Sequence, residues 1–216
     1  KVEFPDEVER EAVALERTSN KPDSKGRTDF RGERIFTIDP STAKDFDDAV
    51  NLFAHEGEGW RVGVHIADVA HYVRAGGCID EEAYERATSI YPVDRVIPML
   101  PETLSNGLCS LRPGEDKCTM SAIFTVMPSG EVSDVELCES LIHSVRRFAY
   151  EEVQGLLDEN DKDKGVRESD APVRFPRPVI AEALFEDLLT IREASRAIRR
   201  RRFRRGALDL DLPETE

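Results

Sequence analysis

The sequence is poor in cysteine and has no long apolar run. Its 4 cysteines are separated by 31, 9 and 20 positions, and none forms the C-x-x-C pair of zinc ribbons and redox motifs. No stretch approaches about 18 consecutive apolar residues, which excludes a spanning helix, and the opening KVEFPDEVEREAV has no apolar core of the signal-peptide type. We therefore expect reduced thiols in a cytoplasmic protein with no membrane partner.

The chain also lacks an excess of basic residues. It has 30 Lys and Arg against 44 Asp and Glu, a formal net charge of −14. Taken alone, this sign argues against nucleic-acid binding, whose footprint is usually basic. The charge is segregated, however, because residues 192–205 hold eight arginines and one acid. That run is a solvated helix end, or it contacts phosphate or another protein, and the sequence leaves these alternatives open.

Hydrophobic periodicity predicts an α+β fold of largely antiparallel strands flanked by helices. Alternating or short apolar runs predict strands at 35–38, 49–54, 61–69 and 207–212, and a hairpin of 119–127 with 131–142. Helical spacing predicts helices at 6–17, at 80–87 with Asp80 as N-cap, and at 179–203, a long C-terminal helix that Gly206 ends. Residues 91–113 and 158–178 are predicted to be loops.

The most specific feature is the string IDPSTAKDFDDAV, residues 38–50, which places Asp39, Asp45, Asp47 and Asp48 within ten positions. Carboxylates gathered this closely repel one another unless a cation offsets them. Mg²⁺ prefers oxygen ligands of this kind, and two ions held by shared carboxylates can support phosphodiester cleavage. The cluster is therefore a candidate metal site.

Simpler interpretations of the cluster remain open. Asp39-Pro40 is also a turn signal and Asp45 a possible helix cap, and the whole stretch is compatible with a solvated acidic loop. The string lacks the glycine and distal glutamate of a calcium-binding loop and has no neighbouring Cys/His set for zinc.

Five ordered strings resemble the ribonuclease II/ribonuclease R family, whose catalytic domain is called RNB. They are TIDPSTAKDFDDAV (37–50), VGVHIADVAHYV (62–73), TSIYPVDRVIPMLPETLSNGLCSLRPGEDKCTMS (88–121), HSVRRFAYEEV (143–153) and RGALDLDLPE (205–214). The set is more similar to ribonuclease R. The resemblance implies a processive, hydrolytic 3′→5′ exoribonuclease that degrades single-stranded RNA to nucleoside 5′-monophosphates.

The resemblance also implies roles for individual residues. The family's four active-site acids match Asp39, Asp45, Asp47 and Asp48, which would hold one or two Mg²⁺ ions (or Mn²⁺), with Asp47 the acid most critical for cleavage. The family stacks terminal bases on aromatic side chains, and its Y-x-P tyrosine matches Tyr91. A half-buried loop tyrosine is the simpler interpretation of Tyr91 alone. Stacking on an aromatic face is tolerant of base sequence, as a degradative enzyme requires.

The resemblance sets the domain organisation we expect: residues 1–32 as an N-terminal helix and lead-in loop, and residues 33–216 as the N-terminal portion of the catalytic domain. The family's domain continues further, with a second aromatic clamp, a catalytic arginine and a glutamate, and OB-fold RNA-binding domains accompany it. This chain alone is then expected to be inactive. A non-catalytic RNA-binding relative and a metal-binding interaction module remain the alternatives.

Other polar residues favour structural roles. His65 and His71 flank Asp68, but His65 lies on an alternating strand and is predicted to pack. Asp209 and Asp211 alternate with leucines and are predicted to form the solvated face of a strand.

Overall fold

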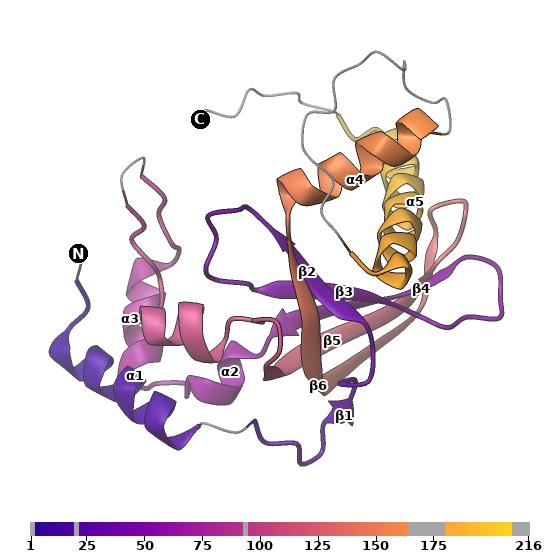
Figure 1. Ribbon diagram of the computed structural model, residues 1–216. Coiled ribbons are helices and arrows are strands. Elements are labelled where there is room, and N and C mark those ends of the chain that lie inside the picture. The colour runs from indigo at the N-terminus through magenta and orange to yellow at the C-terminus, as the bar shows by residue number, and fades with distance from the viewer. Residues whose placement is uncertain (1–2, 20–21, 93–94, 164–179, 209–216) are drawn as a thin grey trace.

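The computed structural model describes residues 3–19, 22–92, 95–163 and 180–208. At its centre lies a six-stranded sheet (Figure 1), formed by β1 (Thr28–Asp29), β2 (Ile35–Asp39), β3 (Asp48–Phe53), β4 (Trp60–Ala67), β5 (Asp116–Val126) and β6 (Val132–Ala149). The strand order is β1-β6-β2-β3-β4-β5, and β6 also pairs with β5. Strands β2 to β6 therefore close into a ring.

Strand β6 closes the ring because its two halves have different partners. Residues 132–143 pair antiparallel with β5, and residues 144–149 pair parallel with β2. The predicted hairpin is confirmed, but β6 runs 18 residues and so extends past its predicted end. The parallel pairings of β1 and β2 with β6 were not predicted, because they join segments about a hundred positions apart that no local pattern connects.

Helices cover the sheet from two sides (Figure 1): α1 (Asp6–Thr18), α2 (Val69–Tyr72) and α3 (Cys78–Arg86) on one side with the π-helical turn η1 (Thr103–Leu108), and α4 (Tyr150–Asp163) and α5 (Glu182–Arg204) on the other. The α+β prediction and the long C-terminal helix are confirmed. Gly206, with φ +93°, follows the end of α5 in the left-handed region that glycine adopts at no steric cost.

Strand β2 is apolar on both faces because it packs against both helical layers. Ile35 and Phe36 are adjacent and fully buried, and successive side chains of a strand point to opposite faces. Ile35 packs in the cluster that contains Val8 of α1 and Ile79 of α3. Phe36 meets Phe148 edge-on at 5.4 Å between ring centroids, in the cluster that includes Leu188 of α5.

Two predictions need correction: the start of the helix predicted at 80–87 and the loop predicted from residue 158. Helix α3 begins at Cys78 after the N-cap Gly77, and Asp80 is not its cap, because the Asp80 carboxylate accepts from the Gly76 N–H at 2.8 Å. Residues 158–163, predicted as loop, form the last part of α4, where Asp161 binds Arg192 of α5 at 2.8 Å. The polar composition that suggested a loop is compatible with a packed helix, because Asn160 is buried and Asp161 is paired with an arginine of α5.

Two arginines of the run at residues 192–205 make contacts within the fold. Gly130, in the turn between β5 and β6, lies so close to α5 that an added Cβ would meet the Ala197 carbonyl oxygen at 2.2 Å. Arg201 and Arg204 donate to the carbonyls of Gly130 and Ser129, at 3.4 and 2.6 Å. These two arginines therefore tie α5 to the turn beneath it.

The predictions on the cysteines, on a membrane-spanning helix and on the terminal strand remain to be compared with the structure. All four cysteines are free thiols, as predicted. Within the described part of the chain, no helix is long and apolar enough to cross a bilayer. Most of the predicted terminal strand, including Asp209 and Asp211, lies outside the described residues.

Candidate active site

The four aspartates of the cluster lie at the ends of two neighbouring strands. Asp39 is the last residue of β2 and Asp48 the first residue of β3, and these strands pair antiparallel. The connecting loop, residues 40–47, carries Asp45 and Asp47. We call residues 40–47 the acid loop.

The acid loop has no regular secondary structure, and distant segments hold its backbone. The Asp47 carbonyl accepts from the Ala67 N–H of β4 at 2.9 Å, and the Phe46 carbonyl accepts from the Leu111 N–H at 2.8 Å. Of the simpler interpretations, the turn after Asp39 is present, because the Ala43 N–H donates to the Pro40 carbonyl at 3.0 Å. The helix-cap interpretation of Asp45 is wrong, since no helix begins there.

A cavity of about 670 Å³ opens beside the acid loop and brings together residues that are far apart in sequence. Its lining comes from the acid loop with Asp39, from residues within 89–92 and 95–98, and from the turn η1 with the residue before it. Its charged, amide and aromatic lining includes Asp39, Asp45, Asp47, Tyr91, Arg95, Glu102 and Asn106. Three of the four predicted acids and the predicted stacking tyrosine thus line one cavity. Asp48 does not line it.

Burial and the charges of neighbouring acids raise the pKa of two of the aspartates, Asp39 and Asp47. The pKa of Asp39, which is 7% exposed, is raised by burial and by the negative charges of Asp48 and Asp45. The pKa of Asp47 is raised by displacement of water and then by the charges of Asp45, Asp48 and Asp39. Asp48 therefore acts on the cavity through its charge. Clustered, raised pKa values of this kind are typical of functional sites.

The carboxylate oxygens are suitable ligands for a hard divalent cation, but they do not form a complete ligand set around one point. One oxygen of Asp39, Oδ2, is buried without a hydrogen-bond partner, and carboxylate oxygens of this kind are what Mg²⁺ takes as ligands. Among the described residues, however, no three acidic, histidine or cysteine side chains converge closely enough to form a ready-made metal cage. A bound cation would need small rearrangements of side chains or water ligands, which Mg²⁺ commonly retains.

Tyr91 lines the cavity beside the loop acid Asp45, and its side chain is largely exposed. It is 66% exposed, and its pKa is raised first by partial burial and then by the negative charge of Asp45. An exposed aromatic side chain beside carboxylates leaves room for a nucleotide base.

Arg147 is a site residue for which the sequence assigned no role. It donates to the Pro40 carbonyl at one end of the acid loop, and its guanidinium lies 5.5 Å from the centroid of the Phe46 ring at the other end. Its positive charge also lowers the pKa of Asp39, against the larger raising effect of burial. The string HSVRRF contains this residue, but nothing in a string of letters shows that β6 lies beside the acid loop.

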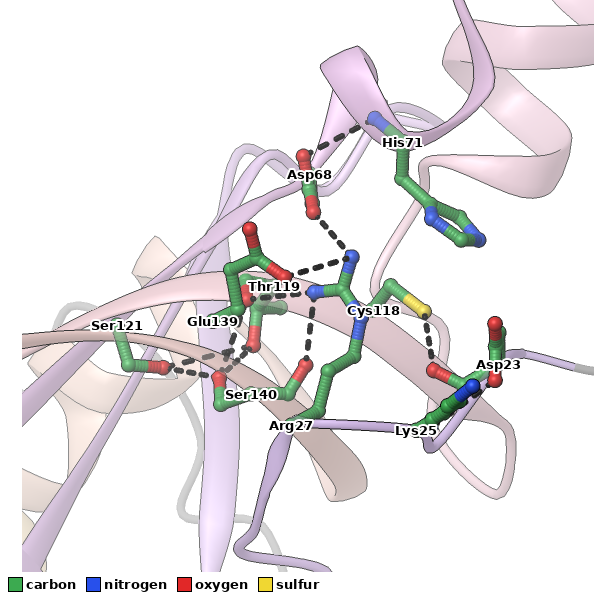
Figure 2. Close-up of polar contacts among 10 residues, drawn as sticks. All are labelled: Asp23, Lys25, Arg27, Asp68, His71, Cys118, Thr119, Ser121, Glu139 and Ser140. Carbon is green, nitrogen blue, oxygen red and sulfur yellow. Dashed lines mark hydrogen bonds and ion pairs between the residues drawn. The ribbon is translucent and has the colours of Figure 1, made fainter.

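The histidines near Asp68 do not form a second site. Figure 2 shows that Asp68 accepts from the His71 N–H at 3.1 Å as the cap of α2, and from Arg27 at 2.6 Å. His65 is fully buried between Ser121 Oγ, at 2.6 Å, and Asn51 Oδ1, at 3.0 Å, and burial lowers its pKa to about 4. The prediction that His65 packs in the interior is confirmed.

Comparison with known proteins agrees with this fold. The family model described as RNB domain matches residues 27–216. The chain is 40% identical over 214 residues to "Ribonuclease R 1" of Lactococcus lactis, covering 99% of this chain and 24% of that protein. It is 46% identical over 157 residues to "Ribonuclease R" of Thermotoga maritima, covering 73% of this chain and 22% of that protein.

A solved structure extends the likeness to three dimensions. Mycoplasma genitalium RNase R in complex with ribose methylated single-stranded RNA matches with a TM-score of 0.82 and 32% identity, over 99% of this chain and 31% of that one. The chain belongs to the RNB-domain family, and the two curated relatives and the solved structure named above are ribonucleases R. It spans about a quarter of the length of the two curated relatives.

Proposed function

We propose that this chain is part of the catalytic domain of a Mg²⁺-dependent, hydrolytic 3′→5′ exoribonuclease that degrades single-stranded RNA to nucleoside 5′-monophosphates. The observation that carries the proposal is the cavity in which Asp39, Asp45 and Asp47 meet Tyr91. Carboxylates for a divalent cation and an aromatic face for a base are the two elements such a reaction needs at an RNA end.

In this proposal the acids hold the metal and the tyrosine holds the substrate. Asp39, Asp45, Asp47 and Asp48 would bind one or two Mg²⁺ ions, or Mn²⁺ in their place. Such an ion, when bound, supplies Lewis-acid stabilisation of the phosphate and lowers the pKa of a water. Burial of Asp39 and the repulsion among the acids keep the apo cluster electrostatically unfavourable, which favours binding of a cation.

The partners follow from the same comparison. The Mycoplasma genitalium relative was solved with single-stranded RNA, and we infer single-stranded RNA as the substrate here. We further infer that the remaining part of an RNB domain and OB-fold domains act together with this chain, and that the enzyme works in the cytoplasm.

The proposal is tested with RNA labelled at either end, supplied to a complete ribonuclease that carries this chain, with and without Mg²⁺. We expect Mg²⁺-dependent release of mononucleotides from the 3′ end, so that 3′-labelled RNA yields labelled monophosphate at once while 5′-labelled RNA shortens stepwise. RNA binding without cleavage would favour a non-catalytic relative. Metal binding with neither would favour an interaction module.

Tyr91→Ala should weaken binding of short RNA by about 1–3 kcal/mol, with little dependence on the base, because one stacking face is lost. The measurement is the Kd for oligonucleotides of different sequence, together with the length of the final products. Tyr84→Ala is the matched control, since Tyr84 is 85% exposed and does not line the cavity. Equal affinities and end products for the two variants would remove Tyr91 from the binding site.

The 216 residues alone should show no processive exonuclease activity. By its resemblance to the family, this chain lacks the arginine used against charge on the phosphate, and loss of one such group costs about 10²–10³ in rate. The measurement is degradation of labelled single-stranded RNA by the purified chain, with Asp47→Asn as the control for contaminating nuclease. Processive degradation by the wild-type chain alone, absent in Asp47→Asn, would contradict this expectation.

A further inference from the structure

One buried hydroxyl makes two contacts with the acid loop. Ser110 follows the turn η1 and is fully buried. Its Oγ accepts from the Phe46 N–H at 3.1 Å and donates to the Lys44 carbonyl at 3.0 Å. A serine hydroxyl has one proton to donate, and here that proton goes to the acid loop while an oxygen lone pair accepts from it.

These two contacts enclose Asp45 and lie directly before Asp47. The neighbouring Leu111 N–H holds the Phe46 carbonyl at 2.8 Å, so Ser110 and Leu111 together make three bonds to the backbone on both sides of Asp45. The acid loop has no helix or strand of its own in this stretch. Its conformation therefore depends on this attachment.

The segment that carries Ser110 is itself held by hydrogen bonds from β5 and within η1. The buried Lys117 of β5 donates through Nζ to the carbonyls of Gly107 and Leu108, at 2.8 and 3.3 Å, at the end of η1. The Cys109 N–H donates to the Leu104 carbonyl at 2.9 Å and closes the turn. These hydrogen bonds hold the segment that carries Ser110. Ser110 itself does not line the cavity.

We infer that Ser110 is the positioning residue of the acid loop: it sets the backbone so that Asp45 and Asp47 present their carboxylates to one divalent cation. The inference rests on the proposed function, because it presumes that these acids bind a metal. Groups that orient metal ligands without touching the metal commonly change metal affinity by about 10–100-fold when they are removed.

The test uses the 216-residue chain with Mn²⁺ as the probe, because titration calorimetry gives its Kd without any enzymatic assay. For Ser110→Ala we expect a Kd for Mn²⁺ raised by about 10–100-fold and faster hydrogen exchange of the Phe46 amide. Ser144→Ala is the matched control: Ser144 is 1% exposed on β6, and its hydroxyl donates to the Arg146 carbonyl at 3.3 Å, away from the acid loop. This control should keep the wild-type Kd and the wild-type Phe46 exchange.

Wild-type Mn²⁺ affinity and a protected Phe46 amide in Ser110→Ala would overturn the role of Ser110 and leave the proposed function intact. If the wild-type chain binds no Mn²⁺, or if Asp47→Asn leaves Mn²⁺ binding intact, the metal-binding proposal is overturned and this inference falls with it. If Ser110→Ala loses amide protection throughout the sheet, the same two criteria are applied to Ser110→Cys, whose thiol is only a weak donor and acceptor.

Discussion

Asp47→Asn should reduce RNA cleavage by at least about 10²–10³-fold in a complete ribonuclease that carries this chain, because under the proposed function it removes a charge that would hold the cation beside the reacting phosphate. The substitution keeps the shape of the side chain. The anchor of this residue is its backbone carbonyl, bound by the Ala67 N–H, so the acid loop should keep its conformation. RNA affinity should change little, since binding is distributed over many phosphate and stacking contacts.

The measurement is single-turnover cleavage of 3′-labelled RNA beside a binding isotherm in the absence of Mg²⁺. Asp23→Asn serves as the control, because Asp23 is an exposed acid in the lead-in segment and does not line the cavity. Cleavage by Asp47→Asn within tenfold of the wild-type rate would show that another acid carries the critical charge.

The sequence predicted the acids of this site but not their supports. Asp39 and Asp48 could be found because strand patterns bracket a dense acidic string, and Tyr91 because a family motif contains it. Ser110 and Arg147 could not, since their contacts with the acid loop join segments 64 to 107 positions apart. A buried serine or a loop-bound arginine looks ordinary until the chain folds.

The fold shows the same division between local and distant information. Helix α5 and strand β4 follow from periodicity within a single segment, and both were predicted. The closure of the sheet was not, because it depends on the two halves of β6 choosing different partners. Helix α4 was missed because its polar residues suit a loop equally well. Its buried Leu156 packs against β2, β6 and α5, and these contacts join segments that no local pattern connects.

Arg27→Met should lower the free energy of unfolding by about 3–5 kcal/mol, because it leaves a buried carboxylate without its cation. The side chains of Arg27 and Asp68 are 5% and 8% exposed and meet at 2.6 Å; Figure 2 shows their contact. Arg27 also donates to the carbonyls of Thr119 and Ser140, at 3.3 and 3.4 Å. Methionine would fill much of the same volume, so the loss should come from charge and hydrogen bonding.

The matched control is Arg31→Met, four residues further along the same lead-in segment. Arg31 is 43% exposed and pairs with Asp29 at 2.6 Å, and exposed ion pairs contribute about 0–1 kcal/mol. Urea denaturation of both variants gives their free energies of unfolding. The two values are compared directly if the m-values are similar. Equal losses would show that the buried pair contributes no more than a surface one.

A double-mutant cycle separates the ion pair from the other contacts of Arg27. Asp68→Asn keeps an oxygen to accept the His71 N–H that caps α2 but removes the charge that faces Arg27. Once that charge is gone, Arg27→Met should cost much less, because no buried carboxylate remains unpaired. Asp68 directly follows Ala67, whose N–H holds the Asp47 carbonyl, so a large coupling energy would mean that the lead-in segment also stabilises the strand end on which the acid loop depends. A coupling near zero would assign the loss to the other contacts of Arg27, which are its two carbonyl bonds and its 3.9 Å ion pair with Glu139.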